Sequence, residues 1–317
     1  MSYFHIPVLS NEIIETINPK SGENLVDGTV GGGGHAEAIL KKTAPDGKLL
    51  GIDLDREAMT ESKRKLKKYS KRIILTKGNY TNFVEIGREY NFHPVDIFFL
   101  DLGISSQQLN SEALGISFLK NAPLDMRMGG DNNKINNYET AEQIINNWSE
   151  DKIESILKNY GEERYAKNIA SKIIEKRKIK RIVNTQQLVE VISEAVSGRY
   201  KNQRIHFATR TFQALRIAVN GELENLEAVL PRVLEKMEVG GRIAIISFHS
   251  LEDRIVKHFF RKESKDCICD SEVPVCICNH KKRLEIITKK PIIASKEEIL
   301  KNPRSRSAKL RVAKKIL

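Results

Sequence analysis

The feature that most constrains the fold is an alternation in the first hundred residues between short apolar runs and stretches with helical spacing. Such an alternation predicts a parallel sheet whose strands are joined by crossover helices. The runs typical of buried strands occupy residues 24–27, 48–55, 72–78, 95–103, 241–250, 283–291 and 309–317. We therefore expect an α/β fold with a Rossmann-like sheet of about seven strands.

The alternation is interrupted in the middle of the chain. Residues 109–212 are polar, and their apolar residues recur at helical spacing, as in "TAEQIINNWSEDKIESILKNY". Because no strand-like run occurs there, we expect an all-helical insert over 109–212. The α/β domain is then discontinuous and consists of residues 1–108 and 213–317.

A glycine run follows the first expected strand, in "DGTVGGGGHAEAIL". Glycines let a backbone approach a ligand closely, and the start of the next helix offers free N–H groups. Gly31, Gly33 and Ala36 fit the dinucleotide pattern G-x-G-x-x-A, and Asp53 ends the next strand, where an acid binds ribose hydroxyls. Sites for NAD and for S-adenosylmethionine share this pattern.

Acidic residues at the strand ends separate these two ligands. Asp27 stands directly before the glycine loop, where the pyrophosphate of NAD would meet a carboxylate. Asp53 and Asp101 also end strands, and three carboxylates at one sheet edge suit the sulfonium and ammonium charges of S-adenosylmethionine. The alternative for each is a residue that caps a helix or terminates a strand.

Charge is concentrated at the C-terminus. The chain carries a net charge of +12, and from Lys281 onward 13 Lys or Arg face only 3 Glu. This tail favours a polyanion such as nucleic acid, although a solvated basic surface is the alternative. The sequence shows neither a signal peptide nor an apolar run long enough for a membrane span, so we expect a cytoplasmic protein without a membrane partner.

Four cysteines lie in "CICDSEVPVCICNH". Cys267, Cys269, Cys276 and Cys278 are followed by His280, but C-x-C twice differs from the usual C-x-x-C spacing of zinc sites. A small zinc site and a loop of free thiols both stay open.

Several motifs carry a family resemblance over essentially the whole chain. "GGGGHAEAIL", "DLGISSQQL", "PLDMRM", "ATRTFQALRIAVNGELE", "ISFHSLEDRIVK" and "NPRSRSAKLRVA" occur in this order. Together they resemble the ribosomal RNA small-subunit methyltransferase H family. The resemblance implies transfer of a methyl group from S-adenosylmethionine to N4 of a cytidine in 16S ribosomal RNA, with no DNA substrate. It also suggests RNA recognition for the insert, and it leaves a homodimer open.

The resemblance also implies a set of cofactor residues. These are Gly33, Gly34, His35, Asp53, Tyr80, Asp101 and Gln108. Three of them, Gly33, Asp53 and Asp101, are also reached from the residues alone. Tyr80 is expected to stack on the adenine, with an ordinary aromatic under the sheet edge as the alternative.

Methylation of a cytosine amine needs an acceptor for an N–H proton, because positive charge grows on the nitrogen as it attacks. The Asp/Asn-Pro-Pro-aromatic motif of many amino-methyltransferases is replaced here by "DLGISS". Asp101, Ser105 and Ser106 are therefore candidate acceptors. His249 is another candidate, because a helix-capping box of Ser250 and Asp253 would leave it unexplained.

Two other function classes are weighed against the methyltransferase. A non-catalytic RNA-binding assembly factor that keeps the fold is disfavoured by the intact loop and strand-end acids. An NAD-dependent oxidoreductase is disfavoured by Asp27 and by the basic tail.

Overall fold

The computed structural model describes residues 7–105, 108–109, 111–129, 139–270 and 275–317. It divides into two compact units. The first unit comprises Met1–Gly103 and Leu223–Leu317, and the second comprises Ile104–Glu222. The boundaries therefore differ from the expected breaks after residues 108 and 212. The second break lies later than expected because Leu215 and Val219 of the helix Thr209–Asn220 are buried in the core of the second unit.

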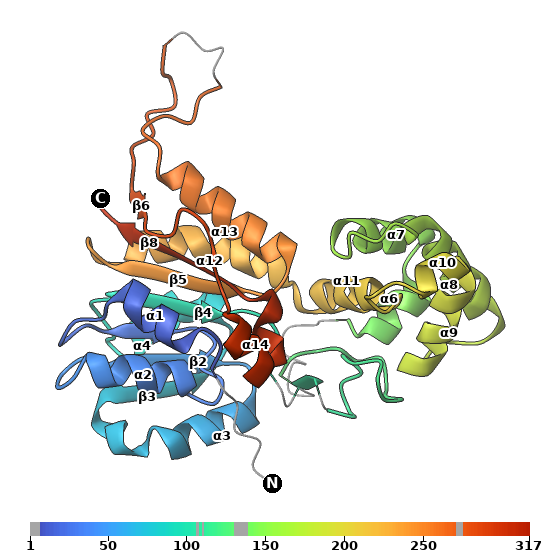
Figure 1. Cartoon of the computed structure of the whole chain (residues 1–317), viewed down its shortest axis with the longest axis horizontal. Coiled ribbons are helices and arrows are strands. Elements are labelled where there is room, and N and C mark those ends of the chain that lie inside the picture. Colours follow the sequence, from blue (N-terminus) through green and yellow to red (C-terminus); the bar gives the residue numbers. More distant parts are fainter. Residues whose placement is uncertain (1–6, 106–107, 110, 130–138, 271–274) are drawn as a thin grey trace. The chain divides into compact units, whose positions relative to one another are not determined.

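An eight-stranded sheet forms the centre of the first unit (Figure 1). Its strands are β1 (Leu25–Asp27), β2 (Leu49–Asp53), β3 (Ile73–Lys77), β4 (Ile97–Asp101), β5 (Arg242–Ser247), β6 (Leu284–Ile286), β7 (Ile292–Ile293) and β8 (Lys309–Lys315). The order is β3-β2-β1-β4-β5-β8-β6, with β7 also paired to β8. Strands β1 to β5 are parallel, whereas β8 is antiparallel to its neighbours. The extra strand β7 is two residues long, too short for a periodic pattern to reveal.

Helices cover both faces of this sheet because the strands are apolar on both sides. Within β4, Phe98 and Leu100 point into one core and Ile97 and Phe99 into the other. Helices α4 (Phe83–Glu89), α12 (Glu222–Lys236) and α13 (Ser250–Glu263) contribute to the first of these cores. Helices α1 (Ser10–Ile17), α2 (Gly34–Lys42) and α3 (Arg56–Lys65) contribute to the second. The first unit is thus a doubly wound, Rossmann-like fold.

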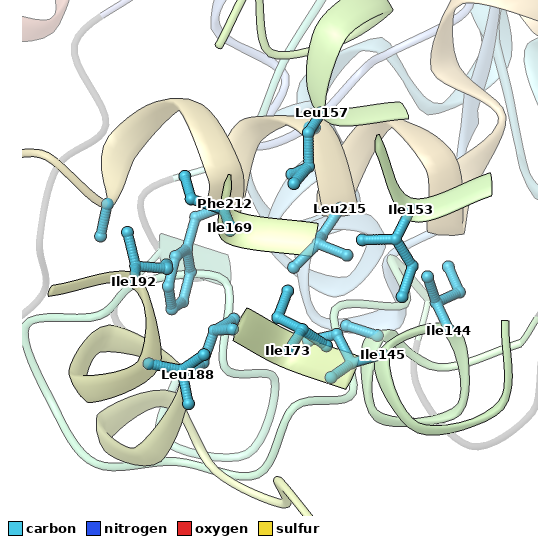
Figure 2. Close-up of a cluster of buried hydrophobic side chains, with 14 of the residues drawn as sticks. Ile144, Ile145, Ile153, Leu157, Ile169, Ile173, Leu188, Ile192, Phe212 and Leu215 are labelled. Carbon is cyan, nitrogen blue, oxygen red and sulfur yellow. The ribbon is translucent and has the colours of Figure 1, made fainter. Parts of the chain in front are cut away.

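The described part of the second unit is built from helices. They are α6 (Ala141–Asn147), α7 (Glu150–Asn159), α8 (Ala166–Ile179), α9 (Thr185–Ala195), α10 (Gly198–Lys201) and α11 (Thr209–Asn220). Thr140 begins α6 with a capping box to Gln143. Figure 2 shows the buried side chains of this unit meeting, with Phe212 and Leu215 of α11 among isoleucines and leucines of the other helices. Between its described residues, one isolated β-bridge joins Pro123 to Asn184.

In the part of the chain that the structure describes, no helix combines the length and the apolar character that a membrane span needs.

Candidate functional site

The acidic strand ends gather where the strand order reverses. Asp27 and Asp101 end the neighbouring strands β1 and β4, and Asp53 ends β2 on the other side of β1. The carboxyl edge at such a reversal is where doubly wound sheets bind ligands. The sequence therefore placed its three candidate carboxylates correctly at one edge.

The glycine loop turns at this edge into helix α2. Gly33 is the N-cap of α2 and has a φ of 76°, a left-handed conformation that strains residues with a Cβ. Gly28 has another constraint, because a Cβ there would lie 2.6 Å from Leu100 Cδ2 and 2.8 Å from Tyr80 Cβ. Position 28 of the turn after β1 therefore packs too closely against its neighbours to accept a side chain.

Asp53 holds the glycine loop in place. Its Oδ2 accepts a hydrogen bond from the backbone N–H of Gly31 at 2.8 Å, and its Oδ1 accepts one from Asp55 at 2.9 Å. Burial raises the pKa of Asp53 to about 6, although these N–H donors act in the opposite direction. Each carboxylate oxygen has a second lone pair, so Asp53 can still accept ligand hydroxyls.

Thr29 links two of the acidic residues, a role that the sequence did not reveal. The N–H of Thr29 donates to Asp27 Oδ1 at 3.1 Å, while its Oγ1 accepts the N–H of Asp101 at 2.7 Å. Burial raises the pKa of Asp27 well above its ordinary value, and the charges of Asp101 and Asp53 add to this effect. Asp27 is fully buried, and its carboxylate binds a backbone N–H of the turn that follows β1. This contact agrees with the alternative in which Asp27 terminates the strand.

His35 and Asp101 face each other with unsatisfied polar atoms. His35 Nε2 lies 3.5 Å from Asp101 Oδ2, and the imidazole packs edge-on against Phe99 with ring centroids 5.0 Å apart. Within the described part of the chain, neither ring nitrogen of His35 nor Asp101 Oδ1 has a hydrogen-bond partner, although all three atoms are buried. Buried polar atoms are rarely left unpaired, so these three are available to a ligand.

Tyr80 lies beside the same loop. It begins the short helix η2 (Tyr80–Asn82) and is partly buried, and its ring packs against the core that contains Leu100. Its Cβ stands close to Gly28. The structure therefore places Tyr80 next to the loop and in contact with the core. Its stacking on the adenine stays a prediction, and so does the alternative of an ordinary aromatic under the sheet edge.

His249 caps helix α13, which corrects the expected capping box of Ser250 and Asp253. The backbone of His249 is extended, its Nδ1 accepts the N–H of Glu252 at 3.4 Å, and Glu252 bonds back to the N–H of His249. Asp253 is unavailable for capping because Arg311 of β8 binds both its oxygens, at 2.6 and 3.2 Å. This capping explains the presence of His249 even without catalysis. A catalytic role for His249 stays a prediction.

Ser105 and Gln108 belong to the second unit and cap each other. The N–H of Ser105 donates to Gln108 Oε1 at 3.0 Å, and the N–H of Gln108 donates to Ser105 Oγ at 3.1 Å. Their predicted contacts with the amine and the cofactor stay predictions. Ser106 lies outside the described residues.

Several cations of the basic tail form ion pairs within the fold and are therefore not available to a polyanion. Arg311 and Lys309 approach Asp253, and Arg283 pairs with Glu263 at 2.6 Å. These pairs hold the antiparallel strands in the sheet, whereas Arg306 is exposed. Part of the positive charge therefore stabilises the fold, and part of it faces solvent.

Comparisons with known proteins agree over the whole chain. A family model described as the MraW methylase family matches residues 2–316. A relative from Syntrophotalea carbinolica is 47% identical over 312 residues, covering 98% of each chain, and one from Heliobacterium mobile is 46% identical over 317 residues, covering 100% of each. A third, from Trichlorobacter lovleyi, is 43% identical over 317 residues and covers 99% of each. All three are named ribosomal RNA small subunit methyltransferase H. A match of this length, together with the loop and sheet edge described above, leads to one conclusion: the chain belongs to the MraW methylase family.

Proposed function

We propose that this methyltransferase, whose methyl donor is S-adenosylmethionine, acts on the N4 amine of a cytidine in small-subunit ribosomal RNA. The observation that best supports the proposal is Asp101 Oδ1 at the carboxyl edge of β4, which is buried and has no hydrogen-bond partner among the described residues. The relatives named above are methyltransferases of the small-subunit ribosomal RNA.

The residues at the sheet edge fit S-adenosylmethionine. Asp27, Asp53 and Asp101 form an acidic edge, and the raised pKa of Asp27 and of Asp53 shows that burial penalises their negative charge. A cationic ligand relieves this penalty, whereas a pyrophosphate would increase it. When bound, S-adenosylmethionine supplies a methyl group on a positively charged sulfur.

Within the proposal, each residue at this edge has a separate role. Gly33 and Gly34 provide backbone close to the ligand, and Asp53 accepts hydrogen bonds from the ribose hydroxyls while it holds the loop. Tyr80 offers an aromatic face to the adenine. His35 stands at the start of α2, and its two ring nitrogens, which accept or donate no hydrogen bond among the described residues, are free for polar atoms of the ligand.

Asp101 is the proposed acceptor for the substrate amine. The lone pair of a cytosine amine is delocalised into the ring, so the nitrogen attacks only when it is held in line and its growing positive charge is stabilised. Asp101 Oδ1 is buried and accepts no hydrogen bond from a described residue, and Thr29 fixes its backbone. The carboxylate is therefore preorganised to accept an N–H bond from the amine.

For RNA recognition we propose the second unit together with the exposed part of the basic tail. A base must leave its stack to reach a buried methyl donor, and contacts to the RNA backbone help to hold it there. The exposed Arg306 is one residue suited to a phosphate contact. A homodimer stays a prediction, to be tested by sedimentation velocity.

The test measures methyl transfer to RNA and identifies the modified nucleoside. Purified protein is incubated with isotopically labelled S-adenosylmethionine and with small subunits, large subunits or free small-subunit RNA, and the RNA is digested for mass spectrometry. We expect N4-methylcytidine in small-subunit RNA alone. A label on another base, on another cytidine atom or in the large subunit would overturn the proposed specificity. Calorimetry with S-adenosylmethionine and NAD, each alone, checks the cofactor separately from the RNA.

A further inference from the structure

The four cysteines converge in a loop that the methyl-transfer chemistry does not use. This cysteine loop comprises residues 264–283 and connects α13 to β6. Figure 1 shows the chain leaving the end of α13, projecting away from the sheet and returning to β6. The Sγ atoms of Cys267, Cys269, Cys276 and Cys278 all lie within 4.8 Å of one another. These are all the cysteines of the chain.

The loop has two arms, one that leaves α13 and one that returns to β6. Beyond the base of the loop, the described contacts between these arms involve sulfur atoms. At the base, the N–H of Arg283 donates to Glu263 O at 2.8 Å and the N–H of Lys282 lies 3.4 Å from Asp266 Oδ1. Farther out, the N–H of Ile268 donates to Cys278 Sγ at 3.4 Å, and Cys278 Sγ lies 3.8 Å from Cys267 Sγ.

The described apolar side chains of this loop do not form a core. The exposed fractions of Ile268, Val275 and Ile277 are 39%, 72% and 76%. Short segments without a core are usually held by disulfides or by a metal ion. An interaction of the sulfurs must therefore compensate for the conformational entropy that the two arms lose when they are ordered.

The sulfur spacing fits a single tetrahedral ion. Zn–S bonds of about 2.3 Å in a tetrahedron place the sulfurs about 3.8 Å apart. The Cys276–Cys278 and Cys278–Cys267 Sγ distances are 3.5 and 3.8 Å. Two disulfides would instead divide the sulfurs into bonded pairs about 2 Å apart. An iron–sulfur cluster would hold some of the sulfurs farther apart, because its thiolates are divided among two or four irons.

We propose that Cys267, Cys269, Cys276 and Cys278 bind one zinc ion, which joins the two arms of the cysteine loop. Four thiolates are a common ligand set for structural zinc. The N–H of Ile268 that points to Cys278 Sγ stabilises a metal-bound thiolate.

His280 lies outside this ligand set. Its Nε2 lies 3.1 Å from the carbonyl oxygen of Lys262 and 3.9 Å from Glu263 Oε2. The zinc ligands therefore come from the two C-x-C pairs alone, and His280 fixes the base of the loop.

The zinc site is separate from the methyl-transfer edge. Leu284 of β6 pairs with Lys315, and Lys314 pairs with Arg242 at the beginning of β5. The loop thus enters the sheet at the amino end of β5, whereas the acidic residues lie at the carboxyl ends of the parallel strands. Zinc stabilises the loop without contacting the cofactor.

The experiment measures metal content in full-length protein purified with a reductant and without chelator. We expect about one zinc per chain in wild type and less than about 0.1 in the Cys276→Ser/Cys278→Ser variant. The matched control, His280→Ala, should keep its zinc. Cobalt in place of zinc should give the intense visible bands of a tetrahedral tetrathiolate site.

Three further measurements make the test independent of folding and of catalysis. Chelation should expose four reactive thiols and accelerate tryptic cleavage after Lys281 by about tenfold or more. The affinity for S-adenosylmethionine, measured by calorimetry, should stay unchanged. Four thiols that react freely in untreated protein, disulfides in non-reducing mass spectrometry, iron in place of zinc, or loss of zinc from His280→Ala would each overturn the proposal.

Discussion

Replacing Asp101 by Asn tests the role of this carboxylate in the chemical step. The two side chains have nearly the same shape, and an Asn oxygen can still accept a hydrogen bond. The substitution therefore removes the negative charge and little else, provided that Thr29 continues to hold the backbone N–H of residue 101 at 2.7 Å.

The size of the effect follows from the burial of Asp101 Oδ1. A hydrogen bond to a charged group is worth about 1.5–3 kcal/mol and a neutral one about 1 kcal/mol, so the difference of about 0.5–2 kcal/mol accounts for roughly 2–30-fold in rate. In a buried site the carboxylate also attracts the positive charge that grows on the amine. Together these effects predict a fall of about 100-fold in the saturated rate, as for other preorganised electrostatic groups.

The assay separates binding from chemistry. Calorimetry gives the affinity for S-adenosylmethionine, and single-turnover methylation at saturating cofactor and RNA gives the rate of transfer. Asp96→Asn is the matched control, because Asp96 precedes the same strand at its opposite end, where its Oδ2 accepts the N–H of Asn24 at 2.8 Å. The control should keep its methylation rate.

Two results would refute the reasoning. A saturated rate of Asp101→Asn within about threefold of wild type would remove the residue from the chemical step, since tenfold corresponds to only about 1.4 kcal/mol. A loss fully restored by more S-adenosylmethionine would assign Asp101 to cofactor binding alone.

Three other predictions follow from contacts in the structure. Gly28→Ala would place its Cβ 2.6 Å from the nearest side-chain carbon, so we expect a loss of about 1–3 kcal/mol in urea unfolding, whereas Gly198→Ala, with open space around it, should be neutral. Because the pKa of Asp53 is about 6 and a cation prefers the ionised carboxylate, calorimetry should show S-adenosylmethionine binding more tightly as pH rises from 5 to 7, and Asp53→Asn should flatten this dependence. Asp253→Asn should lower the free energy of unfolding by about 3–5 kcal/mol, because it leaves the buried Arg311 without its partner. Burial opposes the charge of Asp253, but Arg311 outweighs it and lowers the pKa, so wild type should lose this stability as pH falls below the ordinary carboxyl range, while the variant should not.

The sheet and its acidic edge were predictable because their signals are local. The strand β4 is apolar at every position before its terminal acid, which is typical of a strand covered on both faces. The glycine run between β1 and α2 indicates a close backbone turn. Seven apolar runs thus located seven of the eight strands, and only the two-residue β7 escaped.

The details of the site depend on residues distant in sequence, which local patterns do not reveal. Ser250 and Asp253 fit a capping box by spacing, but Arg311 lies 58 positions away in sequence and binds the Asp253 carboxylate. The cap therefore passes to His249 and Glu252. The role of Thr29 could not be predicted for the same reason, since its partner Asp101 lies 72 positions away in sequence.

The same long-range contacts show how the first unit divides its carboxylates between stability and function. Asp253 is buried beside cations, which lower its pKa, and its charge contributes to folding. Burial raises the pKa values of Asp27 and Asp53, and the charges of neighbouring acids add to this effect while N–H donors oppose it, so the ionised forms of both residues oppose folding at neutral pH. A protein that retains uncompensated acids at one sheet edge gains binding energy there for a cation, because the ligand then supplies the missing positive charge. We therefore propose that S-adenosylmethionine completes the electrostatics of the carboxyl edge of β1, β2 and β4.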